Sequence, residues 1–438
     1  VLLRNIDWRL AGTKMHVSSL YSYSSCSEHP GCPSPTTWLW AISFAIYTSL
    51  LILTCGGTAR ADNVAQECCN DLESRIAELE ASTVRKGNRR ISLTVNGQVN
   101  HAVYGFDDGG EANAYVATNI YTGSRLRFFG KAQITPDWSA GYRMSVNIWP
   151  AESIAQNQNN PNAEFLGPFN LRRTHWFIDS KSYGRLSVGL LGSASDNFIS
   201  ATTSGVVAAT FSNVLLGASL AFRRKDTGDL TGITTFSLAP FLDTLRSDTV
   251  VYTTPSFNGL SLRAGVAEDD FWDVAAYYAG VLGDFDVKAR LGYVNDRDGD
   301  YGTPTSPNTQ DIKGLISARH NPTGLFAEVI HVHRSYETVD ASPASPDFNY
   351  TYGRAGVFKR FMPLGKTSIF GEFARSEGAL VGGNSPGFNA NRGLGQTTNI
   401  TRADFQRWGL GLMQYIDVAA TEMYIGYHNF DVDLATST

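Results

Sequence analysis

From Ile91 onward, apolar and polar residues alternate with a period of two. In the first such segment, ISLTVNGQVN, Leu93, Val95 and Val99 are separated by polar residues and glycine. The same pattern returns in residues 139–149, 259–267, 285–294 and 402–414. A period of two is the spacing of side chains on one face of a β-strand. The sequence therefore predicts an all-β fold.

Composition narrows the class of β-protein. Charged residues make up 18% of the chain, below the roughly 25% typical of soluble domains. The mean hydropathy is -0.17, which alternating membrane strands produce because the average mixes their two faces. A bundle of membrane helices needs several long apolar runs. Only one run in this sequence approaches that length, so a helical membrane bundle is excluded. The net charge of -5, without a basic block, argues against a nucleic-acid partner.

The lengths of the connections distinguish a membrane barrel from a soluble sandwich. Short links are expected at 135–138, 180–184, 254–259, 281–284, 320–324, 362–366 and 415–420. Long connections are expected at 150–169, 296–310, 336–350 and 378–401. Short turns that alternate with long loops are typical of outer-membrane barrels.

The expected strands number fifteen, whereas closed bacterial barrels usually have an even number. The polar ending DVDLATST is not expected to form a strand. The fold predicted from the sequence is a 16-stranded antiparallel transmembrane β-barrel whose final strand is missing from residues 89–438.

The first 61 residues read as a leader. An apolar run over residues 38–55 is followed by the small-x-small cleavage signal Ala59-Arg60-Ala61. The alternative is a single membrane anchor, but no positive stop-transfer flank follows the run. Residues 1–61 are therefore left out of the expected fold.

Residues 62–88 are expected to form a short periplasmic coiled coil. Their apolar seam follows a 4-3 spacing on one helical face and includes Cys69, Leu72, Ile76 and Leu79. A short amphipathic helix docked on its own domain is the alternative. Cys68 and Cys69 are adjacent and have no later cysteine to pair with, so no internal disulfide is expected.

Enzyme, metal and cofactor motifs are weak or absent. The sequence holds no G-x-S-x-G and no H-E-x-x-H motif. Gly365-Lys366-Thr367 resembles the end of a phosphate loop, but Arg360 stands where the loop needs glycine. His331 and His333 would share one face of a strand, yet no third ligand accompanies them. We expect no catalysis, no metal and no cofactor.

The alternation places many charged side chains on the inner face of the barrel, where water can reach them. The predicted basic residues of this face are Arg125, Arg127, Lys131, Arg143, Arg263, Lys288, Arg290, Arg354, Arg360 and Arg407. The predicted acidic residues are Asp273, Asp286 and Glu372. Some of these residues could merely avoid lipid, but several are candidates for one wall of a pore.

A connection of about fifty residues, from Gly192 to Arg246, is the candidate constriction loop. Its acids Asp196, Asp226 and Asp229 are expected to face the basic wall. Opposed rows of charge would order water across a pore and disfavour apolar solutes.

Several segments resemble general porins of alphaproteobacteria, in family order over nearly all of residues 62–438. They include CCNDLESRIAELEASTVRKGNRRISLTVNGQVNHAVYGFDDG, SRLRFFGKAQITPDWSAGYRMSVNI, LGSASDN, TPSFNGLSLRAGVAEDDFWDVAAYYAG and WGLGLMQYIDVAATEMYIGYHNF. The resemblance implies a trimer of sixteen-stranded barrels, with the third extracellular loop folded into the lumen as a constriction. Members of that family usually end in a strand with a terminal aromatic residue, which this sequence lacks.

Together these observations predict a passive outer-membrane pore for small hydrophilic solutes and ions. The expected partners are two further copies of the chain, outer-membrane lipid and lipopolysaccharide. A substrate-selective porin for sugars or anions is one alternative. Another is a structural protein that contacts the cell wall through the coiled coil and uses the barrel as an anchor.

Overall fold

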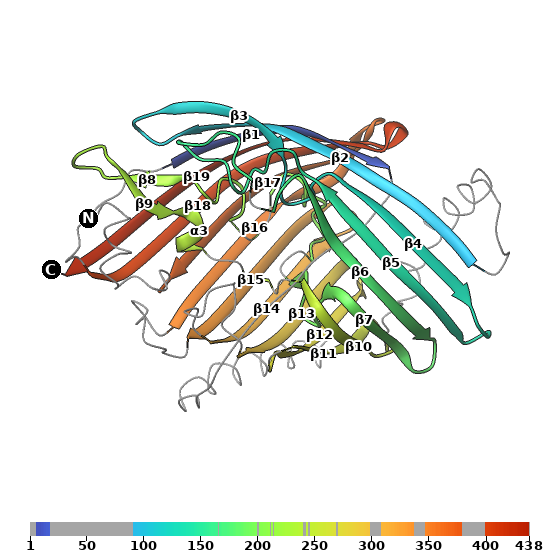
Figure 1. Ribbon diagram of the computed structural model, residues 1–438. Helices are drawn as coiled ribbons and strands as arrows, with labels where there is room; N and C mark the ends of the chain where they lie inside the picture. Colours follow the sequence, from blue (N-terminus) through green and yellow to red (C-terminus); the bar gives the residue numbers. More distant parts are fainter. Residues whose placement is uncertain are drawn as a thin grey trace.

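The computed structural model describes the backbone of residues 6–17 and the chain from 91 to 437, leaving out 165, 199–200, 211, 213, 240–241, 244–245, 269, 298–307, 337–346 and 379–398. The predicted cleavage signal and coiled coil, with Cys69, Leu72, Ile76 and Leu79, lie outside the described residues. Almost all regular structure is β-strand (Figure 1). No helix within the described ranges is long and apolar enough to cross a membrane.

The first group of strands is β1 (Ile6–Val17), β2 (Ile91–Asp107), β3 (Ala112–Thr118), β4 (Arg125–Gln133), β5 (Trp138–Ile148), β6 (Phe169–Ser180) and β7 (Gly184–Gly192). The long connection that follows holds β8 (Ala221–Arg223), β9 (Leu230–Thr234) and the short helix α3 (Thr235–Leu238). The remaining elements are β10 (Arg246–Thr253), β11 (Leu260–Ala267), β12 (Trp272–Leu282), β13 (Phe285–Asp296), β14 (Thr309–His320), β15 (Leu325–Tyr336), β16 (Asp347–Met362), β17 (Gly365–Glu377), β18 (Asn399–Ile416), the 3-10 turn η2 (Asp417–Ala419) and β19 (Thr421–Ser437).

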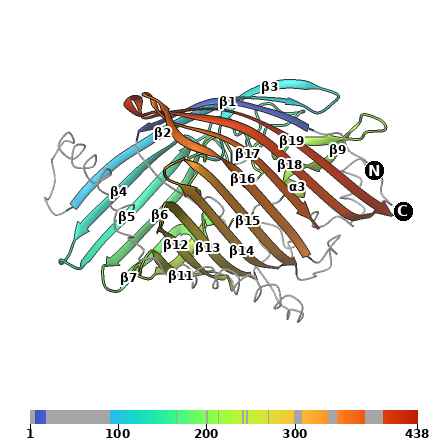
Figure 2. The ribbon, with the colours of Figure 1, turned by 180° about the vertical axis from the view of Figure 1, so that it is seen from behind.

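The strands form one antiparallel sheet in which consecutive strands are neighbours. β2 pairs with β4, β7 with β10, and the series continues strand by strand to β19. β1 pairs with β19 on one side and with β2 on the other. β3 folds back on the outer half of β2. Sixteen described strands therefore follow one another in a ring of pairings, with β1 between β19 and β2 (Figure 2).

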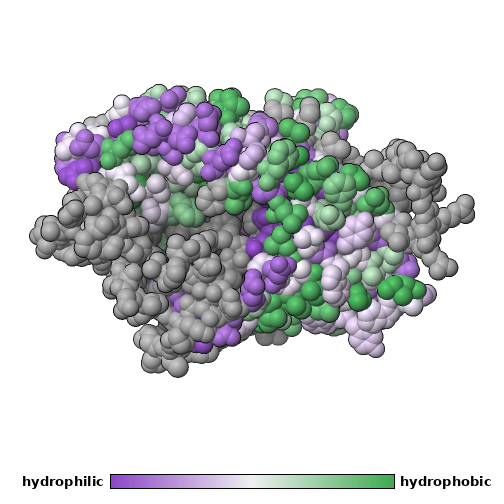
Figure 3. Space-filling view, viewed as in Figure 1, coloured by the Kyte–Doolittle hydropathy of each residue, from purple (hydrophilic) through white to green (hydrophobic). Residues whose placement is uncertain are grey.

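The two faces of the sheet have the opposite polarity to a soluble protein. Leu93, Val95 and Val99 are 50%, 52% and 60% exposed, while Gln98 and Asn100 in the same strand are buried. Large apolar side chains are also exposed along the other strands, and Figure 3 shows them on the outer surface. Burying polar groups while exposing apolar ones is favourable only where the outer face meets lipid.

The expected turns and strands from Ile91 onward agree closely with the structure. All seven short links fall between paired strands, and the four long connections separate the same strands as predicted. β3 was not predicted as a separate strand, because it belongs to a hairpin that pairs only with part of β2.

Two expectations at the ends of the sequence are wrong. The polar ending was expected to lie outside the sheet, but β19 continues to Ser437 and stays paired with β18. Ile6–Val17 was left out of the fold, yet its backbone supplies the strand between β19 and β2. The signal at the C-terminal end is short: Val432 and Leu434 alternate with Asp431 and Asp433, and both apolar side chains are buried. Backbone pairing itself does not depend on an apolar pattern. Whether residues 1–61 act as a leader stays a prediction.

We predict that Gly184→Ala weakens the β6–β7 turn. Gly184 has φ of +86°, and a Cβ there would lie 2.1 Å from the carbonyl oxygen of Thr253. Gly283, at another short turn, has φ of +59° but nothing within 4 Å of an added Cβ. Both alanine variants carry the backbone penalty of about 1 kcal/mol or more, and only Gly184→Ala adds a clash.

The measurement is the temperature at which the folded band of the protein disappears on a gel of samples heated in steps. Gly184→Ala should unfold at a lower temperature than Gly283→Ala. Equal transition temperatures would show that the approach of Thr253 does not constrain this turn.

Candidate functional site

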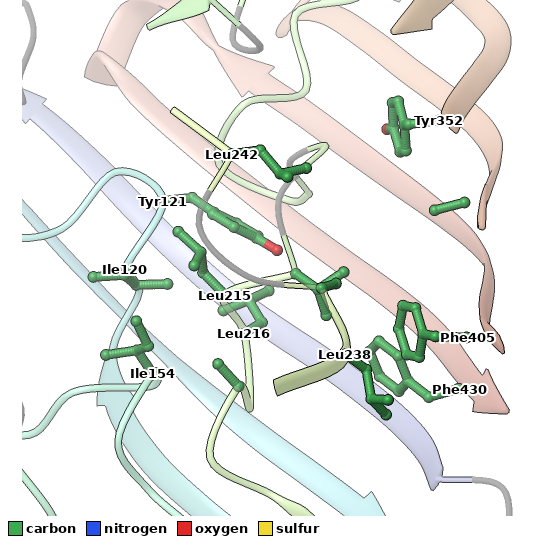
Figure 4. Close-up of a cluster of buried hydrophobic side chains, with 14 of the residues drawn as sticks. Ile120, Tyr121, Ile154, Leu215, Leu216, Leu238, Leu242, Tyr352, Phe405 and Phe430 are labelled. Carbon is green, nitrogen blue, oxygen red and sulfur yellow. The ribbon is translucent and has the colours of Figure 1, made fainter. Parts of the chain in front are cut away.

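The long segment between β7 and β10 packs as a folded unit against the inner face of the sheet. Its Leu215, Leu216, Leu238 and Leu242 are almost fully buried and join a large apolar cluster. Figure 4 shows Leu238 beside Phe405 and Phe430 of β18 and β19, and Leu215 and Leu216 near Ile120 and Ile154. A buried cluster of this size, which includes residues of β2 and β3 as well as of β14–β19, fixes the segment inside the barrel.

The start of the segment is held by β12. The carboxylate of Asp273 accepts hydrogen bonds from the Ser193 hydroxyl (2.6 Å) and from the backbone N–H groups of Ala194 (2.9 Å) and Ser195 (2.6 Å). The Tyr277 hydroxyl donates to the carbonyl oxygen of Ala194 at 2.6 Å. Asp273 was predicted as an acidic pore residue. In the structure it is fully buried and orients the first turn of the segment.

The middle of the segment is held by two buried acids of the opposite strands. Thr210 donates to both carboxylate oxygens of Glu372 at 2.9 Å, and Thr202 donates to Glu328 at 2.5 Å. Glu372 also lies 3.2 Å from Arg407 and 3.0 Å from His428. Arg354 forms an ion pair with Glu328 at 2.5 Å. The charges of both acids therefore have partners inside the wall.

A basic cluster lies on β4, β5 and β6, and its Arg172 lies over the ring of Trp149, a member of the same apolar cluster, at 5.7 Å. Ser145 of β5 pairs with Arg127 of β4 and Arg173 of β6, and Arg143 lies two residues along β5 from Ser145. Arg173 approaches Asp196 at 2.6 Å, and both side chains are buried. Arg127, Arg143 and Arg173 therefore lie on three adjacent strands, and Asp196 contacts one of them.

Arg172 and Arg173 were not among the predicted residues. Consecutive residues of a regular strand face opposite sides, so a regular strand would turn at most one of them inward. The register between β5 and β6 shifts here, because Ser145 pairs with Arg173 and Val146 pairs with Leu171. This β-bulge lets both arginines lie on the buried face. The sequence offers no local signal for the bulge.

The other predicted basic residues lie at several places. Arg125 and Arg127 are 5% and 3% exposed. Arg263 and Arg290 lie over the ring of Tyr277, with 4.1 Å and 4.7 Å between guanidinium carbon and ring centroid. Arg290 and Lys288 donate hydrogen bonds to the carbonyl oxygens of Asn197 and Thr202, the latter at 2.9 Å. Lys131 forms an ion pair with Asp179 at 3.8 Å, and Arg319 forms one with Asp286 at 2.8 Å.

Three predictions about individual charges are corrected. Arg360 is exposed and pairs with Asp417 in a short turn. Asp226 lies at the exposed tip of the β8–β9 hairpin, where it pairs with Arg224 of the same hairpin. Asp229 lies in the same tip, and its backbone bonds to Arg224. Of the three loop acids, Asp196 contacts the basic cluster.

His331 and His333 lie together on β15, as their spacing predicted. Their ring nitrogens bond to Thr351 (2.9 Å) and Asn349 (2.9 Å) of the neighbouring strand. Within the described residues, no group of three or more His, Cys, Asp or Glu side chains is placed to hold a metal ion.

An antiparallel ring of strands with an apolar outer face and a charged inner face defines the class of membrane β-barrel proteins. Residues 48–437 match the family of Gram-negative porins. The chain belongs to this family and is an integral outer-membrane β-barrel protein.

Comparison with solved structures gives matches of low sequence identity. A loop-deletion form of OmpT from Vibrio cholerae covers 78% of this chain with all of its own length, at 12% identity and a TM-score of 0.44. An anion-selective porin from Comamonas acidovorans covers the same share with all of its length, at 12% identity and a TM-score of 0.43. No curated protein matches the chain by sequence.

We predict that docking of the long segment weakens as the pH rises. Burial raises the pKa of Asp196 to about 6 and that of Asp243, near the other end of the segment, to about 7. An unfolded aspartate has a pKa near 3.9, so the docked state binds more protons between about pH 4 and pH 7. Its stability should therefore fall as the pH rises through this window.

Protease protection of the segment at pH 5 and pH 8 tests this expectation. Cleavage should be slower at pH 5. Asp243→Asn should reduce the difference between the two pH values, because an amide does not titrate. Its oxygen can still accept the hydrogen bond from the Phe198 N–H. Asp226→Asn is the control, since Asp226 is exposed. Equal protection at both pH values in the unmodified protein would contradict the prediction.

Proposed function

We propose that the chain forms a passive, water-filled pore for small hydrophilic solutes and ions. The observation that carries this proposal is the inner face, where arginine, lysine and asparagine side chains lie on strands whose other face is apolar. Charged groups on a membrane strand are tolerated where water reaches them. Membership of the Gram-negative porin family supports the same function.

The segment between Gly192 and Arg246 narrows this pore in the proposal. Its length far exceeds the usual connection of about 4–6 residues. It occupies space on the inner side of β16, β18 and β19 and is tied to Glu328, Glu372 and Asp273. Solutes would then pass along the side of the barrel formed by β4, β5 and β6.

The charges on this route support a preference for anions. Glu328 and Glu372 lie in ion pairs with Arg354 and Arg407, so they add little net charge. The basic cluster, in contrast, gathers three guanidinium groups with Asp196 as the neighbouring acid. In a narrow channel, nearby charges outweigh distant surface charges, which salt screens over about 8–10 Å.

Several finer proposals rest on the resemblance to alphaproteobacterial porins. We propose a homotrimer in contact with outer-membrane lipid and lipopolysaccharide, with residues 62–88 as a periplasmic coil. Opening of the channel in steps of three equal conductances would support the trimer. A substrate-selective pore for anions or sugars is the second candidate, and the basic cluster favours an anion over a sugar.

The reversal potential across a salt gradient in a planar bilayer tests the pore and its selectivity. The unmodified protein should form channels with a weak anion preference. Arg143→Ala and Arg127→Ala should lower that preference while conductance remains, because each removes one charge of the cluster. Arg224→Ala is the matched control, since Arg224 lies in the exposed hairpin tip.

Two results would contradict these proposals separately. A correctly folded protein that forms no channels would refute the pore. Channels whose ion preference is the same in Arg143→Ala, Arg127→Ala and the control would refute the role of the cluster in selectivity.

A further inference from the structure

The ring of strands has one seam at which segments far apart in the sequence meet. We define the seam as β19, β1 and β2, where β1 lies between the other two strands. Two adjacent strand intervals of about 4.8 Å separate β19 from β2. A side chain, or a folded segment inside the barrel, can span such a gap.

The first link across the seam lies inside the barrel. The Tyr424 hydroxyl of β19 donates to the side-chain oxygen of Asn100 on β2 at 2.6 Å. The β1 residue in register with Tyr424 is Gly12, which has no side chain. Tyr424 and Asn100 are almost fully buried, so the bond is protected from competing water.

The same link extends to the long segment. The side-chain amide of Asn119 donates to the Tyr424 hydroxyl at 2.9 Å and to the backbone carbonyl of Ala208 at 2.7 Å. Asn119 follows β3, and it is fully buried. Ala208 belongs to the segment between β7 and β10. One hydrogen-bonded chain thus joins β19, β2 and the segment.

The second link lies at the end of the barrel that carries the long loops. Arg223, in the β8–β9 hairpin, donates through Nε to Asp108 at 2.7 Å, just after β2. Asp108 is fully buried and also accepts hydrogen bonds from Gln158 and from two backbone N–H groups of its own turn. Figure 1 shows the hairpin beside the β2–β3 turn.

The surroundings of Arg223 are shaped to hold it. A Cβ at Gly110 would lie 2.7 Å from Nε of Arg223 and 2.8 Å from Cδ, so a larger residue would displace the guanidinium. Two residues further along the hairpin, Lys225 lies 3.8 Å from Asp431 of β19. This exposed pair contributes little by itself. It shows, however, that one hairpin reaches both strands that flank β1.

We propose that the segment between β7 and β10 is a staple that holds the seam of the barrel together, in addition to narrowing the lumen. The inner link through Tyr424, Asn100 and Asn119 joins β19, β2 and the segment. The outer link through Arg223 and Asp108 joins the segment to the end of β2. The proposal assigns these five residues the role of positioning the two strands that flank the seam.

Hydrogen exchange of the purified full chain in detergent tests the staple and does not depend on channel activity. Tyr424→Phe and Arg223→Ala should each speed exchange of backbone amides in β1, β2 and β19, while β13 and β14 on the far side keep their protection. The double variant should show the largest effect. The folded band on a gel should also disappear at a temperature lower by about 5 °C, as the loss of one or two hydrogen bonds implies.

Matched controls separate a staple from simple anchoring of the segment. Tyr350→Phe removes a hydroxyl that donates to the Ser212 carbonyl from β16, away from the seam. Arg224→Ala removes the neighbouring arginine of the hairpin, which pairs with Asp226. Neither control should loosen the seam. If the double variant fails to fold, Gly110→Ala tests the outer link alone by displacing Arg223.

The outcomes are distinct. Faster exchange confined to the seam in Tyr424→Phe and Arg223→Ala supports the staple. Unchanged exchange in both variants would overturn it, as would an equal loss of protection around the whole ring or an equal effect of Tyr350→Phe.

Discussion

A strand in the hydrocarbon layer must find hydrogen-bond partners for its backbone on both sides, because lipid offers none. This constraint explains why the sheet of this protein returns to its first strand. Apart from β3, β8 and β9, fifteen described strands from Ile91 onward follow one another and leave β19 and β2 each with one open edge, and β1 lies between them. The seam therefore forms around backbone pairing, whatever the hydropathy of the strand that occupies it.

Closing the sheet creates a second problem, since the inner face of each strand carries polar and charged side chains. The structure solves it by pairing many of these charges inside the barrel. Near β16–β19, Glu372, Arg407 and Thr210 satisfy one another while the segment between β7 and β10 brings its own apolar core. Burial of paired charges costs desolvation, which an apolar core beside them offsets. The segment is consequently part of the interior of the barrel and not a loose loop.

Much of this architecture is predictable from the sequence, because alternation and turn residues are local signals. The seven short turns and the strands after Ile91 follow from them. Pairing of Ile6–Val17 is not local, since its partners lie about ninety and four hundred residues away. The site shows the same limit: inward residues such as Arg127 follow from alternation, whereas Arg172 and Arg173 share a face through a bulge that only the register reveals.

The same distinction explains why a count of inward charges is a poor guide to selectivity. Asp273 and Glu372 face inward, but one caps the turn at Ser193 and the other is neutralised by Arg407. Arg360, near the end of β16, is exposed and pairs with Asp417 of the short turn η2. The cluster around Arg143 is, in the proposed pore, the group of charges that acts on a passing ion. In the proposed pore, the packing of one segment thus determines both the free side of the lumen and the sign of the potential there.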